Sequence, residues 1–300
     1  MNVVSGWVDR LKCPSCDGSV SQEEATVVCR TCDITYPVRT GVVQMLSEEQ
    51  GALAETFNAQ YDALRLKEGW ASDIPGFYDA LPYRDLTGRN TDAWRQRVRS
   101  YLLVRRWLEN TVGTGRISIL DYGAGNGWLS RLLADRYDLA AMDINEGNHG
   151  LSAIPESSRL YTVIQSSLES IPLHSDCCDA VVANASLHYT SAPEGALEEI
   201  HRILKPGGVV VIMDSPTYSS TQGVRQAMKR SHSYFCQMGF PDLANHYAGL
   251  TDALFKANDL FLYRPLRKDF STLELLKKRF REAMGHPESA RFPVWTGRKL

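Results

Sequence analysis

The stretch ILDYGAGNGW, residues 119–128, decides the fold, because it joins an apolar strand to a helix through a glycine-rich loop. The apolar run before Asp121 is typical of a buried strand, and helical periodicity begins at about Asn126. Three glycines at alternate positions lie between them. In open α/β sheets, ligands bind at such loops, outside the carboxyl ends of the strands. The stretch therefore predicts a ligand-binding turn.

Strands and helices alternate from residue 116 onward. Apolar and β-branched runs predict the strands, and amphipathic periodicity predicts the helices between them. The predicted strands are 117–122, 138–143, 160–165, 178–184 and 208–214, with helices from about residue 126 and over 193–204. This alternation predicts the α/β class, with a mostly parallel, doubly wound, Rossmann-like sheet. We assign residues 116–300 to this domain.

Four cysteines near the amino terminus follow the pattern C-x2-C-x12-C-x2-C; they are Cys13, Cys16, Cys29 and Cys32. Two such pairs can turn four thiolates toward one point, which suits a closed, structural Zn²⁺ site. Strand-like segments surround them, so residues 1–46 are predicted to form a small β zinc ribbon. The alternative is four separate core or disulfide cysteines, which a chain without a signal peptide disfavours.

Composition and charge limit the function classes. The chain has 300 residues, of which 43% are hydrophobic and 23% charged, and its formal net charge is −2. Such a charge gives no global attraction to nucleic acid or anionic lipid. There is no apolar signal segment and no run of about 18 apolar residues that would cross a membrane. We therefore expect a cytoplasmic protein that does not enter a membrane.

The residues outside the sheet are expected to form a linker and a lid. Helical periodicity and a loop rich in Pro, Gly and Asn fill residues 47–115, and a lid insertion is expected at about 215–250. The helix predicted over 91–112 has an apolar face made of Trp94, Val98, Tyr101, Leu102, Leu108 and Val112.

The spacing of the glycines favours one kind of ligand. A dinucleotide fingerprint has the pattern G-x-G-x-x-G, whereas Gly123, Gly125 and Gly127 follow G-x-G-x-G behind Asp121. A carboxylate at this strand end favours a cationic group over a pyrophosphate. S-adenosylmethionine carries an ammonium and a sulfonium and has no phosphate. The alternative is that the glycines only make a tight turn.

Further cofactor contacts are predicted at the next strand ends. We expect Asp121 and the backbone of Gly123, Ala124 and Gly125 to hold the amino-acid part of S-adenosylmethionine. A ribose diol requires a carboxylate about twenty residues after the loop, and Asp143 is there, followed by Ile144. The remaining cofactor-binding candidates are Ser167 and Leu168 beside the adenine, and Asn184.

Successive motifs in this region resemble those of class I S-adenosylmethionine-dependent methyltransferases of the methyltransferase type 11 kind. The motifs are ILDYGAGNGWLSRLL, MDIN, SLESIP, CDAVVANASLHY and HRILKPGGVVVIMD. The resemblance spans about residues 116–214 and implies a seven-stranded sheet of order 3-2-1-4-5-7-6 whose last strand is antiparallel. We assign strands six and seven to 260–266 and 291–297. Related enzymes usually have Asp where this chain has Ser167.

The order of the two domains resembles that of large-subunit ribosomal-RNA guanine methyltransferases. In these enzymes a four-cysteine zinc module and a linker precede a class I domain. The ribbon itself carries four basic and five acidic residues over 1–45, which is a poor charge for binding phosphates. The ribbon therefore indicates architecture more than it indicates a substrate.

The chemistry at the site is predicted to be methyl transfer, an in-line displacement that depends mostly on positioning. Asn184, His188 and Tyr189 follow a strand end near the expected methyl group. His188 is the candidate general base for an acceptor hydroxyl or amine. The alternative is that His188 only packs in its loop, because methyl transfer does not require a base.

The acceptor is predicted to be a small or medium-sized molecule, methylated at O, N or C. RNA is the second possibility, because residues 89–107 interleave six arginines with aromatic residues that could stack bases. The same arginines could equally be the solvated side of an amphipathic helix. Two further alternatives are a non-catalytic zinc-ribbon adaptor and a nicotinamide oxidoreductase, and the glycine spacing disfavours the oxidoreductase.

Overall fold

A computed structural model describes residues 6–153, 160–256, 264–266 and 287–300. Its centre is a seven-stranded sheet in the order β7-β6-β5-β8-β9-β13-β12. The strands are β5 (Ser118–Tyr122), β6 (Asp138–Asp143), β7 (Thr162–Gln165), β8 (Cys178–Asn184), β9 (Leu204–Met213), β12 (Arg264–Leu266) and β13 (Val294–Arg298). Six of them run in the same direction, and β13 is antiparallel to both of its neighbours.

This topology confirms the predicted fold class and the strand order 3-2-1-4-5-7-6. The antiparallel strand is the seventh, as the resemblance implies. Strand six was predicted over 260–266, and β12 occupies Arg264–Leu266. The rest of that prediction lies outside the described residues.

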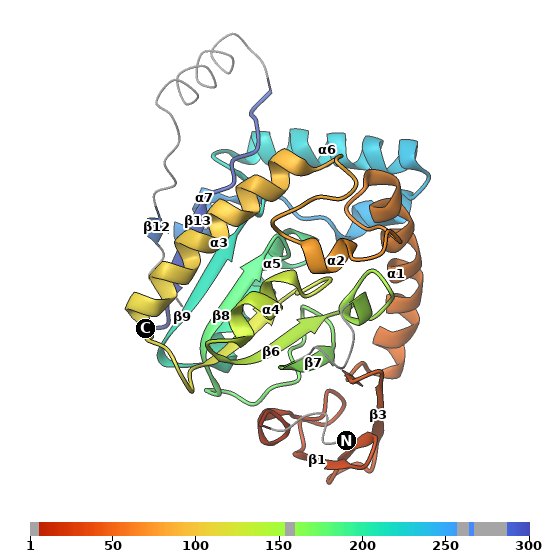
Figure 1. The fold of residues 1–300 in the computed structure, drawn as a ribbon, viewed down its shortest axis with the longest axis vertical. Coiled ribbons are helices and arrows are strands. Elements are labelled where there is room, and N and C mark those ends of the chain that lie inside the picture. The colour runs from red at the N-terminus through yellow and green to blue at the C-terminus, as the bar shows by residue number, and fades with distance from the viewer. Residues whose placement is uncertain (1–5, 154–159, 257–263, 267–286) are drawn as a thin grey trace.

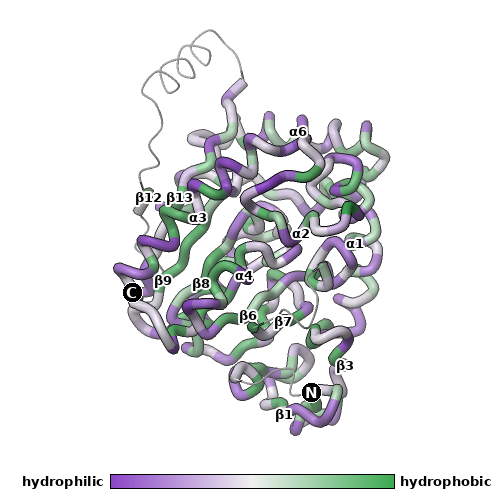
Figure 2. The backbone as a smooth tube through the Cα atoms, viewed as in Figure 1, coloured by the Kyte–Doolittle hydropathy of each residue, from purple (hydrophilic) through white to green (hydrophobic). Residues whose placement is uncertain are grey.

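Helices cover both faces of the sheet (Figure 1). On one face, α3 (Thr91–Thr111) and α4 (Trp128–Ala134) pack on alternate strand residues such as Ile119. On the other face, α5 (Pro193–Ile203) packs on the intervening residues, such as Leu120. Because successive strand side chains point to opposite faces, one strand serves both cores. Figure 2 shows the hydrophobic residues gathered along the central strands.

The cysteine-containing region forms a small antiparallel ribbon. It contains η1 (Val8–Arg10), β1 (Val20–Glu23), β2 (Thr26–Cys29), β3 (Thr35–Arg39) and β4 (Val42–Gln44). At its end, β4 pairs in parallel with β7, so the ribbon extends the central sheet to eleven strands. Asp138 at the start of β6 accepts hydrogen bonds of 2.8 Å from Trp7 and from Arg10. The ribbon is therefore docked on the sheet, and a boundary at residue 46 stays a prediction.

The remaining elements gather over the carboxyl ends of the strands. They are α1 (Glu48–Glu68), α2 (Phe77–Ala80), η2 (Leu151–Ala153), η4 (Leu187–Tyr189), β10 (Thr217–Tyr218), α6 (Thr221–Met238), η5 (Pro241–His246), β11 (Leu250–Thr251) and α7 (Asp252–Lys256). Ser47 and Gln50 form a capping box that begins α1, and Gly69, at a φ of 77°, ends it. A cluster of Leu64, Phe235 and Leu243 packs α1 against α6 and η5. None of the described helices is long and apolar enough to span a bilayer.

Candidate functional site

The loop after β5 is shaped by two glycines with different surroundings. Gly123 has a φ of +71°, and a Cβ at this position would lie 2.2 Å from the Cβ of Ser186. Gly125 has a φ of +54°, but a Cβ there would meet no atom within 4 Å. Only glycine adopts such backbone angles without strain. Gly123 is therefore required by the packing of the protein itself, whereas Gly125 leaves the backbone open to an approaching ligand.

Asp121 is a buried carboxylate with one unsatisfied oxygen. Its Oδ2 accepts a 2.6 Å hydrogen bond from Ser130, while its Oδ1 has no partner in the described residues. Burial raises the pKa of Asp121 to about 7, and the charge of Asp143 adds to the rise. A buried orphan oxygen normally requires a partner. The ammonium of S-adenosylmethionine has the charge and the donors that Oδ1 lacks.

Asp143 ends β6 and holds the loop in place. Its two oxygens accept hydrogen bonds from the backbone of Gly125 at 2.8 Å and of Asn145 at 2.9 Å. Burial raises the pKa of this carboxyl above its usual range. The next carbonyl, that of Ile144, accepts from Asn58 of α1. The structure thus brings together the predicted amino-acid and ribose contacts, and α1 reaches the same edge.

The residues after β7 lie at the same edge of the sheet. The backbone N–H of Ser166 donates to Asp143 O at 3.0 Å, so this loop is adjacent to the end of β6. The carbonyl of Leu168 accepts a 2.5 Å hydrogen bond from Tyr122, and Ser167 Oγ accepts from the backbone of Glu169. These positions are consistent with the predicted adenine contact, and the contact itself stays a prediction.

Asn184 ends β8 and belongs to a buried polar chain. Its side-chain amide donates to Asp214 at 2.9 Å, and Ser100 of α3 donates to the other oxygen of Asp214 at 2.6 Å. The chain ties α3 to the ends of β8 and β9. Asn184 therefore lies beside the site, held by hydrogen bonds within the protein.

His188 and Tyr189 lie in η4, where His188 is buried and Tyr189 is half-buried. The ring of His188 is 3.2 Å from Ser215 Oγ and packs against Tyr189 and Tyr247. Burial, followed by the charges of Arg65 and Arg97, lowers the pKa of His188 to about 3. A neutral imidazole with such a pKa is a weak proton acceptor near neutral pH. The contacts and the lowered pKa suit a packing and hydrogen-bonding role, and the role of His188 as a base stays a prediction.

Two arginines complete the site, and the sequence analysis assigned neither to it. Arg65 of α1 hydrogen-bonds Tyr189 and Glu68, and its guanidinium lies 4.5 Å from the ring centre of Tyr61. Arg97 of α3 lies over the rings of Trp70 and Trp94, at 4.4 and 4.7 Å from their centres.

The inward row of α3 explains why Arg97 was missed. The row was predicted through Val98 and Leu102, but Leu102 is 45% exposed. The buried side chains Trp94, Tyr101, Val104 and Leu108 are 7, 3 and 4 residues apart, and Arg97 divides the first interval into steps of 3 and 4. The sequence could have indicated Arg97, because it lies at the helical spacing of the buried apolar residues of α3.

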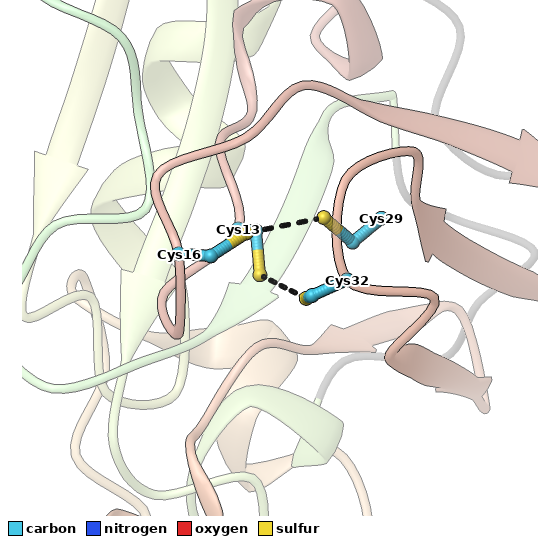
Figure 3. A group of neighbouring side chains, drawn as sticks. All are labelled: Cys13, Cys16, Cys29 and Cys32. Carbon is cyan, nitrogen blue, oxygen red and sulfur yellow. Dashed lines mark hydrogen bonds between the residues drawn. The ribbon is translucent and has the colours of Figure 1, made fainter.

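The four cysteines converge from two loops of the ribbon (Figure 3). Their sulfurs all lie within 4.8 Å of one another, with Cys13 and Cys32 at 3.7 Å and Cys16 and Cys29 at 3.5 Å. A tetrahedral Zn²⁺ site with Zn–S bonds of about 2.3 Å requires sulfurs about 3.8 Å apart. The donor set and its dimensions fit Zn²⁺.

Comparisons with known proteins agree with the fold. Residues 120–212 match the family model of a methyltransferase domain. The ubiquinone/menaquinone biosynthesis C-methyltransferase of Syntrophotalea carbinolica is 29% identical over 148 residues, which are 45% of this chain and 61% of that protein. An uncharacterized chloroplastic methyltransferase of Arabidopsis thaliana is 28% identical over 161 residues, 42% of this chain and 45% of that protein. The matches thus span about half to three fifths of these relatives.

Two solved structures share the fold at low sequence identity. A CurJ carbon methyltransferase superposes with a TM-score of 0.50 at 17% identity, covering 92% of this chain and 76% of that one. The [4+2]-cyclase SpnF superposes with a TM-score of 0.50 at 15% identity, covering 83% and 96%. Together with the family match over residues 120–212, the topology shows that this chain has the Rossmann-like fold of class I methyltransferases.

Proposed function

We propose that the protein transfers the methyl group of S-adenosylmethionine to an O, N or C atom of a small or medium-sized molecule. The observation that carries the proposal is the buried, unpartnered Oδ1 of Asp121 beside the open backbone of Gly125. Asp143 ends the next strand, where a ribose diol would bind. One edge of the sheet therefore presents the carboxylate of Asp121, the open backbone of Gly125 and the carboxylate of Asp143.

The bound cofactor supplies an electrophilic methyl on a sulfonium. The chain contributes binding and positioning. Asp121 would hold the ammonium. Asp143 would hold the ribose, and it would give up one of the hydrogen bonds that it accepts from the backbone of Gly125 and Asn145. The rings of Tyr61, Tyr189 and Tyr247 meet edge to face next to the site, where they would help to keep water from the acceptor.

The covering of the site supports an enclosed acceptor. Helix α1, together with α6 and η5, packs over the carboxyl ends of the strands through the Leu64 cluster. The helix that was considered for RNA does not present all of its arginines to solvent, because Arg97 is directed toward Trp70 and Trp94. Both features favour a small or medium-sized molecule over a long polyanion.

The test has two steps. Calorimetry with S-adenosylmethionine and with NADH should show binding of the first only, which separates methyl transfer from hydride transfer. Cell extract treated with and without ribonuclease is then assayed for methyl incorporation and for S-adenosylhomocysteine formation. We expect incorporation that survives ribonuclease. Incorporation that ribonuclease abolishes would make RNA the substrate, and cofactor binding without turnover on any extract would indicate an adaptor.

We also propose that the four cysteines bind one structural Zn²⁺ and that the protein is cytoplasmic, where thiols stay reduced. The sulfur distances and the loops on which they lie support the site. Cys16→Ser should release the metal and loosen residues 6–46, because metal binding in small modules is coupled to folding. Elemental analysis and limited proteolysis measure both effects. Cys236→Ser, at an exposed cysteine of α6, is the matched control and should change neither.

A further inference from the structure

Arg97 lies on the buried side of α3 in an aromatic setting. Its guanidinium is 4.4 Å from the ring centre of Trp70 and 4.7 Å from that of Trp94, and these two rings meet edge to face. Stacking of this kind holds the planar group in one orientation and leaves its N–H edge for a hydrogen-bond acceptor. The side chain is therefore positioned before any ligand arrives.

Arg97 lacks the partner that the neighbouring Arg65 has. Arg65 is paired with Glu68 at 2.5 Å and hydrogen-bonded to Tyr189. Within the described part of the chain, no carboxylate or carbonyl pairs with the Arg97 guanidinium. Asp214 is the carboxylate whose charge affects Arg97 most, and it already accepts hydrogen bonds from Ser100 and Asn184.

An arginine in this setting favours an anion. Burial lowers the pKa of Arg97, although a guanidinium remains protonated near neutral pH. Arg97 is half-buried, and a charge that is partly removed from water without a paired group carries part of the cost of desolvation. An oxyanion on a ligand would offset that cost, and the fork of N–H groups matches a carboxylate or a phosphate in two parallel hydrogen bonds.

The position of Arg97 indicates whether that anion belongs to the acceptor or to the cofactor. Its charge acts on His188 and Asp214, at the ends of β8 and β9. At Asp121 the causes are its own burial, Ser130 and Asp143, and Arg97 is not among them. Arg97 therefore lies toward the ends of β8 and β9 and does not act on Asp121, which favours the acceptor as the source of the anion.

We propose that Arg97 binds an oxyanion group, a carboxylate or a phosphate, that the methyl acceptor carries apart from the methylated atom. This inference rests on the proposed function and names the class of its substrate. Tyr61 and Tyr189, which meet edge to face, suit a flat ring next to that anion. The acceptor would thus be an acidic molecule with an apolar, ring-like part.

The experiment uses the full-length protein saturated with S-adenosylhomocysteine and three probes that share one ring: benzoate, phenyl phosphate and neutral benzamide. Trp70 and Trp94 flank Arg97, so their fluorescence reports occupancy, and calorimetry at fixed ionic strength gives dissociation constants. We expect at least one of the two anions to bind about tenfold more tightly than benzamide, the scale of a charge-assisted hydrogen bond. The anion that binds identifies the oxyanion as carboxylate or phosphate.

Two variants at Arg97 and one control sharpen the result. Arg97→Gln should erase the preference for the anion, and Arg97→Lys, which keeps the charge but not the fork, should retain part of it. Arg99→Gln, two residues along the same helix on its exposed side, should leave the preference intact. Equal binding of all three probes to the wild-type protein overturns the proposal, and so does an anion preference that survives in Arg97→Gln.

A last arm tests whether the anion belongs to the cofactor. S-adenosylhomocysteine contains a carboxylate, and 5′-methylthioadenosine lacks the whole amino-acid part. If Arg97→Gln weakens the first about tenfold and leaves the second unchanged, Arg97 binds the cofactor and the proposal is overturned. If the wild-type protein does not bind S-adenosylhomocysteine at all, the proposed function fails instead, and the anion preference is then measured on the protein alone.

Discussion

The two sides of the site are built in different ways. The proposed cofactor side, residues 121–125, 143–144 and 166–168, is held mainly by backbone groups and short loops at the ends of β5, β6 and β7. The proposed acceptor side is made of side chains on α1, α3 and η4, namely Tyr61, Arg65, Arg97 and residues 188–189. One side depends on the local path of the chain, and the other on contacts between distant elements.

This difference teaches where binding and specificity reside. A loop whose shape is set by backbone angles can be shared by proteins with different substrates, because it recognises only the common cofactor. The acceptor side depends on a few charged and aromatic side chains. The following predictions test the comparison by changing one side while measuring both.

The largest effect is expected at Gly123. Gly123→Val places side-chain atoms against Ser186, at a backbone φ of +71°. We expect the free energy of unfolding to fall by about 3 kcal/mol or more, from overpacking and left-handed strain together. Urea unfolding measures it. A Cβ at Gly125 meets no atom within 4 Å, so Gly125→Val should cost mainly the strain, about 1–2 kcal/mol, while abolishing cofactor binding. Equal destabilisation by both variants would contradict the distinction between the two glycines.

Asp143 tests the cofactor side alone. Asp143→Ala should weaken S-adenosylmethionine binding by about 1.5–3 kcal/mol, the range for hydrogen bonds to a charged group. Calorimetry gives the dissociation constant. The control is Asp138→Ala at the other end of β6, where the side chain holds Trp7 and Arg10 of the ribbon. It should loosen the ribbon and leave cofactor affinity unchanged. An unchanged constant in Asp143→Ala would mean that the ribose is held elsewhere.

The residues predicted to bind the cofactor do lie together at one edge of the sheet, because the signals that select them are local; their contact with the cofactor stays a prediction. A strand, alternate glycines and a carboxylate lie within ten residues, and the next carboxylate follows at a fixed interval. On α3 the sequence left two interpretations open for Arg97, contact with RNA or the solvated side of the helix, and neither places it against tryptophan rings. Trp70 lies 27 residues away, after the end of α1, and comes close to Arg97 only in the folded protein.

The junction between ribbon and sheet shows the same limit. The cysteine spacing predicted a separate small module, and the four sulfurs do converge. Nothing in the sequence indicated that Val42–Gln44 would pair with β7, because the two strands are about 120 residues apart and carry no complementary pattern. Strand pairing at such a distance is set by the whole packed structure and not by either segment.

Asp121 makes the stability of the cofactor-free protein depend on pH. Burial raises its pKa from 3.8 to about 7, so the folded state disfavours the charged form. The group's contribution to stability is therefore complete below about pH 4 and is lost as the pH rises to 7. Asp121→Asn should remove this part of the profile and gain about 1–3 kcal/mol over the wild type at pH 8, but little at pH 4.5. Urea unfolding at several pH values measures it. A gain that is independent of pH would contradict the prediction.

The smallest effect is expected at His188. It tests the proposed acceptor side, because the imidazole of His188 should not become protonated in the range from pH 5 to 9. Burial and the charges of Arg65 and Arg97 lower the pKa of His188 to about 3, so the ring should stay neutral from pH 5 to 9. The histidine NMR signal that disappears in His188→Gln should therefore keep its neutral shift down to pH 5. If acceptor turnover is measured, His188→Gln should lower kcat without changing the shape of the pH profile. A signal that titrates near pH 6.5 and vanishes in His188→Gln, with loss of the matching step in the profile, would restore His188 as a general base.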